Sequence, residues 1–355
     1  MPIDEIRKNM RKEGLDAFIV SQIYNLRYLS KFTGSNGTLI ITPHERFLLT
    51  DFRYYQQAEQ QSPDWTLVQL GNDPKKRFSE FLNEQQFKTI GFEADFVTVA
   101  QLNEWQEKSE TINFVSTTDW VMDLRAVKTP SEIIKIRRAV ALADETIEHL
   151  YNWIKPGMTE KEVAWELEVF VRTHGGDGLA FPPIVAVNEN SSKPHASISD
   201  HRIELGDVVL IDMGCIIDGY NSDVTRTFSL GEPKHPDFLK IWDLVHHANQ
   251  TAATGIKAGM LSKDADALAR DLIASAGYGD MFGHSLGHGV GANVHEKPAL
   301  SSTKDYPLET GNVVTIEPGI YLQGEFGVRL EDIAIITQTG VQVLTSVRKI
   351  AILDK

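Results

Sequence analysis

Two aspartates stand where apolar residues would otherwise form a buried hairpin. Asp212 lies inside the apolar run 208–215, and Asp223 follows the pair Asp218-Gly219. Asp-Gly is a strong signal for a two-residue hairpin loop. With that loop, Gly214 pairs with Asp223, and the two aspartates share one face as diagonal neighbours, roughly 7–8 Å apart at the backbone. Two carboxylates that converge on one buried point require a cation, because an unpaired buried charge costs several kcal/mol.

Three histidines follow in and beside a glycine-rich segment. His284 and His288 lie within 282–291, and His295 comes four residues later. Glycines let the backbone approach a ligand closely, and neutral imidazole is the commonest nitrogen ligand of divalent metals. One histidine here would be interpreted as structural, but three at this spacing favour a binding site.

Two glutamates occupy similar places further along the chain. Glu317 ends the apolar run 313–316, and Glu331 lies inside the apolar run 328–336. If the loop 323–327 closes a hairpin, the two glutamates lie roughly opposite each other. The sequence therefore predicts four carboxylates and one imidazole at a common point.

Each acid also has a plainer explanation that the sequence leaves open. Asp212 could pair with an arginine such as Arg226, and Glu331 could pair with Arg329, which shares its face of the strand. Asp223 and Glu317 could simply be turn residues. An EF-hand is excluded for 218–223, because its ligand spacing and its closing glutamate are absent.

A dinuclear metal site explains all five residues together. Four buried carboxylates would repel one another without cations, and two divalent ions would balance them. Oxygen-rich ligation with one nitrogen suits Mn or Co, with Zn or Fe also possible. Two such ions about 3.5–4 Å apart activate a bridging water and stabilise a tetrahedral intermediate, which is the chemistry of hydrolysis.

Composition limits the partners and the compartment. The 355-residue chain has a net charge of −14, which argues against a nucleic-acid or anionic-membrane binder. Its single cysteine, Cys215, excludes an intrachain disulfide and a thiolate cluster and fits a reducing compartment. The N-terminus has no apolar core of signal-peptide length, and no run reaches the 18 or so apolar residues of a membrane span. We expect a cytoplasmic protein.

The elements that must position these residues indicate two domains, 1–124 and 125–355. The first third alternates short apolar runs with amphipathic segments, as in an α/β domain. Capping boxes at Thr129/Glu132 and Thr159/Glu162 start two helices of the second domain, which we expect to be α+β. The expected helices are 3–12, 53–61, 130–154, 159–175, 236–258 and 263–276, and the expected strands are 17–21, 38–42, 47–50, 66–70, 89–92, 184–187, 208–215, 223–229, 313–317 and 329–337.

The five candidate ligands stand in motifs whose order resembles the pita-bread metallopeptidases, a family with methionine aminopeptidase, Xaa-Pro aminopeptidase and prolidase among its members. The resemblance covers roughly 125–355. The N-terminal third resembles the α/β accessory domain of the creatinase/prolidase branch, through NLRYL, FTGSNG and TDFRY, which makes methionine aminopeptidase improbable. The motifs of the catalytic domain are IDMG at Asp212, SDVTRTF at Asp223, GHSLGHGVG at His288, TIEPGIY at Glu317 and VRLEDIA at Glu331.

The resemblance implies a role for each matching residue. Asp212, Asp223, His288, Glu317 and Glu331 match the metal ligands, with Asp223 and Glu331 expected to bridge the two ions. Glu317 also matches the proton shuttle for the bridging water. The remaining matches are His195 on the substrate side, His295 near the scissile carbonyl and the proline, His284 as a third pocket histidine, and Arg329 as an arginine that orients ligands.

The residue at position 299 bears on whether the substrate is a dipeptide or a longer peptide. A prolidase accepts only Xaa-Pro dipeptides and must recognise a free carboxylate, for which a bidentate arginine is the natural device. Prolidases similar to this chain carry an arginine just after the VHExP segment, where this chain has Ala299, with Lys297 nearby. We therefore expect a Xaa-Pro aminopeptidase acting on peptides with proline second, with prolidase as the alternative.

Two further expectations rest on the resemblance. The first is a homodimer in which Asp51, Arg53 and Tyr54 of one subunit contribute to the partner's pocket; a structural turn before a helix explains these residues equally well. The second is a remote alternative, a non-catalytic binding module or a metal-free enzyme such as creatinase. Both typically lose metal ligands, and all five positions are filled here.

Overall fold

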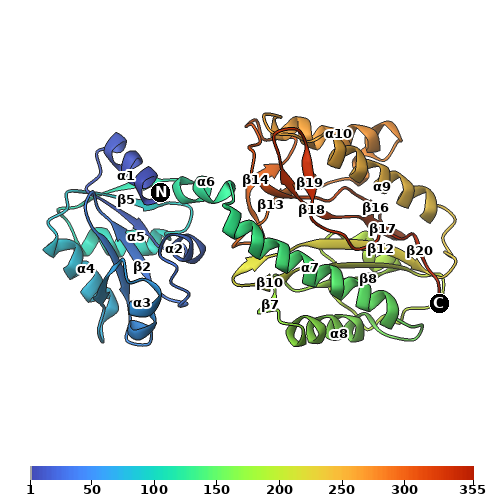
Figure 1. The fold of residues 1–355 in the computed structure, drawn as a ribbon, viewed down its shortest axis with the longest axis horizontal. Helices are drawn as coiled ribbons and strands as arrows, with labels where there is room; N and C mark the ends of the chain where they lie inside the picture. The colour runs from blue at the N-terminus through green and yellow to red at the C-terminus, as the bar shows by residue number, and fades with distance from the viewer. Residues whose placement is uncertain (1) are drawn as a thin grey trace. The chain divides into compact units, whose positions relative to one another are not determined.

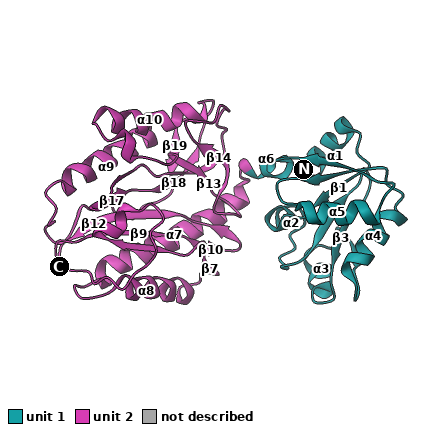
Figure 2. Ribbon diagram, turned by 180° about the vertical axis from the view of Figure 1, so that it is seen from behind, with its two compact units in different colours: residues 1–125 teal, residues 126–355 magenta. Residues whose placement is uncertain are grey.

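A computed structural model describes residues 2–355, and its contacts divide the chain into one unit that ends at Arg125 and a second that begins at Ala126 (Figure 2). The first unit has a six-stranded sheet in the order β4-β3-β2-β1-β5-β6. Its strands are β1 Ala17–Val20, β2 Thr38–Ile41, β3 Arg46–Thr50, β4 Thr66–Gln69, β5 Thr89–Glu93 and β6 Asn113–Thr117. Its helices are α1 Pro2–Glu13, α2 Ile23–Ser30, α3 Tyr55–Gln61, α4 Pro74–Glu84, α5 Val99–Lys108 and α6 Trp120–Ala126, which runs across the division.

Strand β1 shows why this sheet is covered on both faces. Phe18 and Val20 join a core with α1 and α2, whereas Ala17 and Ile19 join another with α4 and α5. Side chains alternate between the faces of a strand, so an uninterrupted apolar strand needs helices on both sides. This is the α/β layering that the sequence predicts.

The second unit contains four α-helices, and both predicted capping boxes form at the starts of α7 and α8. The helices are α7 Pro130–Trp153, α8 Glu160–Thr173, α9 Phe238–Gly255 and α10 Ser262–Ser275, with 3₁₀ turns η1 Asn188–Ser192 and η2 Gly279–Met281. The strands are β7 Gly178–Leu179, β8 Ile184–Val187, β9 Val208–Met213, β10 Cys215–Ile217, β11 Tyr220–Asn221, β12 Val224–Leu230, β13 Gly287–Gly289, β14 Glu296–Leu300, β15 Val313–Ile316, β16 Gly319–Leu322, β17 Phe326–Arg329, β18 Asp332–Ile336, β19 Val341–Val343 and β20 Ile352–Leu353.

Two main sheets of this unit carry the helices on their outer sides (Figure 1). Helices α7 and α8 pack on the sheet β20-β12-β9-β8, and α9 and α10 pack on the sheet β14-β13-β15-β18-β19. The sheets meet where the N–H of Glu331 donates to the carbonyl of Thr225. The expected architecture, an α+β unit that follows an α/β unit, is confirmed.

The predicted hairpin registers are also confirmed. Ile217 pairs with Tyr220 across Asp218-Gly219, whose two φ angles of 50° and 75° are those of a tight hairpin loop. Val224 pairs with Met213, which places Asp223 beside Gly214. Strands β15 and β18 pair next to the two glutamates, because Ile316 lies opposite Asp332.

Two predicted strands are interrupted next to candidate metal ligands. The run 208–215 divides into β9 and β10 at Gly214, where a Cβ atom would stand 2.1 Å from the carbonyl oxygen of Ser222. The run 329–337 divides around Glu331. Each break lets a backbone leave the regular sheet next to a candidate ligand.

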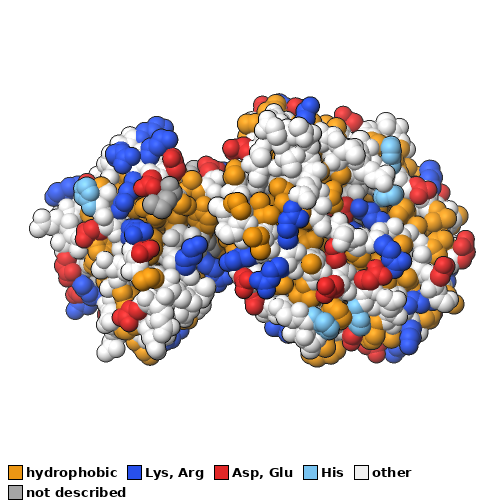
Figure 3. Space-filling model, viewed as in Figure 1, with side chains coloured by type: hydrophobic (Ala, Val, Ile, Leu, Met, Phe, Trp, Pro, Cys, Tyr) orange, Lys and Arg blue, Asp and Glu red, His pale blue; other side chains and the backbone are white. Residues whose placement is uncertain are grey.

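The described chain contains no helix with the length and apolarity needed to cross a bilayer. On the face shown in Figure 3, each unit carries acidic as well as basic side chains.

Candidate active site

All nine residues predicted for the site line one cavity of about 560 Å³ in the second unit. They come from strands of both main sheets and the segments beside them, from β17, and from the loop between β8 and β9. The cavity wall also includes apolar residues such as Phe181, Pro182 and Ala299. The nine are His195, Asp212, Asp223, His284, His288, His295, Glu317, Arg329 and Glu331.

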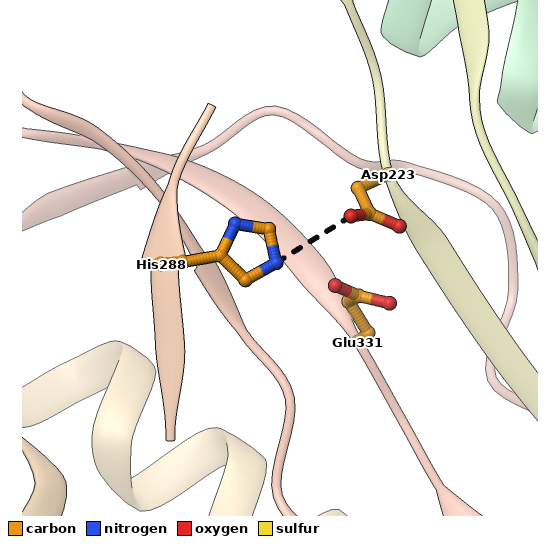
Figure 4. A group of neighbouring side chains, drawn as sticks. All are labelled: Asp223, His288 and Glu331. Carbon is orange, nitrogen blue, oxygen red and sulfur yellow. Dashed lines mark ion pairs between the residues drawn. The ribbon is translucent and has the colours of Figure 1, made fainter. Parts of the chain in front are cut away.

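Asp223, His288 and Glu331 form the tightest group (Figure 4). One ligand atom from each lies within 4.8 Å of the others, and Nε2 of His288 is 3.6 Å from Oδ2 of Asp223. Asp223 precedes β12, His288 lies in β13, and Glu331 stands between β17 and β18. Three segments that are remote in sequence therefore aim ligand atoms at one point.

Glu317 and Asp212 complete the set around this group. Nε2 of His288 is 3.3 Å from Oε1 of Glu317. Oδ2 of Asp212 accepts a hydrogen bond from Nη2 of Arg329. The other oxygen of Asp212, Oδ1, is buried and has no partner within residues 2–355. A buried acceptor without a donor is costly, and a bound cation would satisfy it.

The tautomer of His288 also suits a metal ligand. Its Nδ1 lies 3.1 Å from the carbonyl oxygen of Gly289. A carbonyl can only accept, so Nδ1 carries the hydrogen and Nε2 presents its lone pair to the carboxylates. Burial lowers the pKa of His288, which favours this neutral form.

The carboxylates repel one another in the absence of cations. Burial raises the pKa of Asp223 well above its usual value, and the neighbouring carboxylates, Glu331 first, raise it further. The pKa of Glu331 is raised by burial and then by Glu317. Burial also raises the pKa of Glu317. Four converging acids with a single paired arginine therefore fit divalent ions.

Two threonines orient these ligands. Oγ1 of Thr315 donates to Oε1 of Glu317 at 3.0 Å and accepts from the N–H of His288. Oγ1 of Thr225 donates to Oε2 of Glu331 at 2.6 Å. Neither threonine is among the residues predicted for the site. Thr315 stands two residues before Glu317 on its strand, so alternation of strand side chains could have identified it.

A chain of hydrogen bonds joins His284 to Arg329. Nδ1 of His284 donates to the carbonyl of Ser285, so Nε2 accepts from the hydroxyl of Tyr321 at 2.9 Å. That hydroxyl accepts from Nη1 of Arg329 at 2.7 Å. Tyr321 is likewise absent from the predicted site residues, although it stands in the TIEPGIY motif.

His295 and His195 occupy the cavity wall. The rings of His295 and His288 lie 4.3 Å apart between centroids. Burial, and then the neighbouring histidines, lower the pKa of His295 to about 4. The residue before His195, Pro194, accepts a hydrogen bond from Nη1 of Arg329 through its carbonyl.

The two ion pairs considered as alternatives do not form. Arg226 pairs with Asp332 at 2.9 Å, and Asp212 pairs with Arg329 instead. Thr225 lies opposite Asp212 in the hairpin, so its neighbour Arg226 points to the other face. The carboxylate of Glu331 accepts from Thr225 rather than from Arg329.

In the first unit, Asp51 organises an exposed turn. It accepts hydrogen bonds from Nε and Nη2 of Arg53 at 2.7 and 2.8 Å and from Asn36 at 2.6 Å. The hydroxyl of Tyr54 lies 2.6 Å from that of Ser35. Helix α3 begins directly afterwards, at Tyr55. These contacts correspond to the turn before a helix.

Comparisons with known proteins identify the family of each part of the chain. Residues 134–338 match the model of metallopeptidase family M24, and residues 2–127 match the creatinase/prolidase N-terminal domain. A Xaa-Pro dipeptidase of Pyrococcus furiosus is 34% identical over 98% of both chains. The structure of a Xaa-Pro dipeptidase from Bacillus anthracis is 38% identical, covers 99% of this chain and 98% of its own, and has a TM-score of 0.95. That of an X-Pro aminopeptidase from Thermotoga maritima is 37% identical, covers 96% and 98%, and has a TM-score of 0.88.

Proposed function

Because the chain belongs to metallopeptidase family M24, we propose that it hydrolyses the bond between the first residue of a peptide and a proline in second position. The observation that carries the proposal is the convergence of four carboxylates and one imidazole in a cavity of about 560 Å³. A cavity of this volume admits a peptide end rather than a folded chain.

The five ligands Asp212, Asp223, His288, Glu317 and Glu331 would hold two divalent ions. Manganese is the first candidate, and cobalt, zinc and iron suit the same ligands. When bound, the ions supply an activated water and stabilise the oxygens of a tetrahedral intermediate. Retention of all five ligands argues against a non-catalytic binding module.

The remaining residues act around this centre. Glu317 takes a proton from the attacking water, and Thr315 holds its carboxylate in place. His295, beside His288, donates a hydrogen bond to the developing oxyanion. His195 contacts the substrate from the opposite loop. Arg329 fixes Asp212, and Tyr321 links Arg329 to His284.

Ala299 favours an aminopeptidase over a dipeptidase. A dipeptidase must bind a free carboxylate, which a guanidinium recognises best. Among the described residues that line the cavity, the only guanidinium belongs to Arg329. Its N–H groups donate to Asp212, Thr225, Tyr321 and Pro194, and Asp212 balances its charge. The methyl group of Ala299 lies at the wall without a charge to offer.

A dipeptidase is the second candidate, because relatives similar over almost their whole length carry that name. The deciding experiment supplies Mn²⁺ and compares a Xaa-Pro dipeptide with a Xaa-Pro tripeptide. Preference for the tripeptide supports the aminopeptidase, and cleavage of the dipeptide alone supports the prolidase. Cleavage of neither by the metal-loaded protein contradicts both.

We also propose a cytoplasmic homodimer. The compartment is supported by the single cysteine, which fits a reducing environment. The dimer is supported by the exposed turn at Asp51, where Phe52 is 73% exposed and the side chain of Arg53 is 57% exposed. Arg53 would contribute to the partner's pocket. Light scattering gives the mass in solution. An Arg53→Ala variant that stays dimeric and fully active would exclude this role for Arg53.

A further inference from the structure

The loop that carries His195 is held by a carboxylate outside the cavity. Glu160 is the first residue of α8 and is fully buried. Its Oε1 accepts hydrogen bonds from the N–H of Val187 at 2.8 Å and from Nδ2 of Asn190 at 3.1 Å. Its Oε2 accepts from the same Nδ2 at 3.0 Å and from the N–H of Ser199 at 2.6 Å.

These bonds close the loop at both ends. Val187 ends strand β8, and Ser199 lies twelve positions later, beyond His195. Nδ2 of Asn190 donates in addition to the carbonyl of Ser197 at 3.0 Å, which repeats the closure inside the loop. His195 therefore lies between two attachments to a single carboxylate.

A second set of contacts fixes the other side of the loop. The N–H of Gly327, in β17, donates to Oγ of Ser191 at 2.9 Å. A Cβ atom on Gly327 would stand 2.1 Å from the carbonyl oxygen of Ser191, so only glycine permits this approach. Arg329, also in β17, donates a hydrogen bond to the carbonyl of Pro194. The loop is therefore held by α8 on one side and by β17 on the other.

Glu160 is not required as a helix cap. Thr159 and Glu162 already form the capping box of α8. Burying a carboxylate is costly unless it is fully hydrogen-bonded. Here the cost is offset by donors from the loop and by the favourable N-terminal end of the helix dipole. A buried carboxylate whose side-chain hydrogen bonds all go to one loop indicates that the conformation of this loop is important for the function of the protein.

We propose that Glu160 is a positioning residue, which fixes the backbone of 187–199 so that His195 faces the substrate. It is not among the residues that line the cavity, and it acts only through the loop. The catalytic consequence rests on the function proposed above, whereas the effect on the loop does not.

The test compares Glu160→Gln with Glu162→Gln. An amide places an NH₂ group where one oxygen accepts from Val187 or Ser199, so one attachment is lost. Glu162→Gln perturbs the same helix end, because Glu162 accepts from Thr159, but leaves the loop untouched. We expect E160Q to lower kcat/KM for a Xaa-Pro peptide by about tenfold or more, and E162Q to lower Tm with kcat/KM unchanged.

A double-mutant cycle with His195→Ala separates positioning from general destabilisation. If Glu160 acts through His195, E160Q causes no further loss of kcat/KM in the H195A background. Equal losses in both backgrounds would contradict the proposal. If E160Q does not fold, Asn190→Ala can replace it in the same double-mutant cycle. This substitution removes Nδ2, which donates to both oxygens of Glu160.

Amide hydrogen exchange supplies a readout that does not need activity. E160Q should speed exchange within 187–199, and E162Q should not. Unchanged exchange in E160Q overturns the proposal. If the wild type cleaves neither peptide, the proposed function fails. Hydrogen exchange in E160Q and E162Q, together with the NMR shift of the His195 ring, still decides whether Glu160 positions the loop.

Discussion

Nη2 of Arg329 donates to Oδ2 of Asp212, while the second oxygen of that carboxylate is buried without a partner among residues 2–355. One side of Asp212 is thus fixed by the protein, and the other is available to a cation. Hydrogen bonds that orient a metal-ligating side chain from outside the metal site typically change metal affinity by about 10–100-fold.

Arg329→Lys should therefore weaken metal binding by about 10–100-fold and lower kcat. Lysine keeps the charge but cannot reproduce the planar array of donors to Asp212, Thr225 and Tyr321. Isothermal titration with Mn²⁺ measures the affinity. The control is Arg348→Lys at the surface pair with Glu148, which should change nothing. An unaltered Kd in R329K would contradict the positioning role.

Glu317→Ala should abolish turnover. The variant loses a metal ligand and the group that accepts the proton of the attacking water, so we expect a loss of more than about 1000-fold in kcat. Near-normal activity would rule out the mechanism. Glu325→Ala is the matched control, because Glu325 lies in the exposed turn between β16 and β17. Within residues 2–355 its one ion pair is with His235, at 3.0 Å.

The contribution of Asp223 and Glu331 to the stability of the metal-free protein should fall as the pH rises, whereas the lowered pKa values of His284, His288 and His295 act in the opposite direction below the ordinary histidine pKa. The pKa values of Asp223 and Glu331 are raised in the folded state by burial and neighbouring carboxylates, so the folded state binds protons more tightly than the unfolded state does. The contribution of these two carboxyl groups is then greatest below the ordinary carboxyl pKa and falls as the pH rises through the raised values. Tm measured with chelator from pH 4 to 8 tests this.

Metal should remove that dependence, because divalent ions neutralise the same carboxylates. The Tm gained on adding Mn²⁺ should therefore grow with pH. Asp223→Asn is the matched variant: its metal-free Tm should decrease less with rising pH than that of the wild type, and it should lose the gain from Mn²⁺. Metal-free Tm profiles of wild type and Asp223→Asn that run parallel across this pH range would contradict the prediction.

The sequence specified local geometry wherever a short-range rule applies. The loop Asp218-Gly219 set the register that joins Asp212 to Asp223, and the two capping boxes set the starts of α7 and α8. Helices α4 and α5 were not predicted, although Asp73 and Thr98 cap them. Alternation along β12 would also have excluded Arg226 as the partner of Asp212.

Long-range partners could not be found in this way. Arg329 lies 117 residues from Asp212, and Thr225 lies 106 residues from Glu331. Only the meeting of two sheets brings these pairs together. Glu160 is hidden for another reason, because the first residue of a helix is normally solvated, and its burial depends on a loop that folds back over it.

The buried pair of Arg226 and Asp332 should be important for stability. Arg226 donates to the carbonyls of Glu331 and Val347 as well as to Asp332. Asp332→Asn leaves a buried guanidinium without its counter-ion, which costs about 3–5 kcal/mol. The surface pair Arg138–Asp218 provides the comparison, and Asp218→Asn should cost at most about 1 kcal/mol. Calorimetry on both variants decides; equal shifts in Tm would contradict the difference in burial.

Ala299→Arg should move the preference of the enzyme toward dipeptides. Ala299 lies at the cavity wall, and an arginine there would offer a fork of donors to the carboxylate of a bound Xaa-Pro dipeptide. We expect the ratio of kcat/KM for the dipeptide over the tripeptide to rise by about 10- to 100-fold, since one charge-assisted contact is worth roughly 1.5–3 kcal/mol.

Ala299→Gln is the control for this substitution. Glutamine fills the same part of the cavity without a charge, so it should lower kcat/KM for both peptides with little change in their ratio. A ratio that rises equally in both variants would mean that size, not charge, selects the dipeptide. A ratio that does not move in A299R would mean that the carboxylate binds elsewhere, and Ala299 would then carry no information about the substrate.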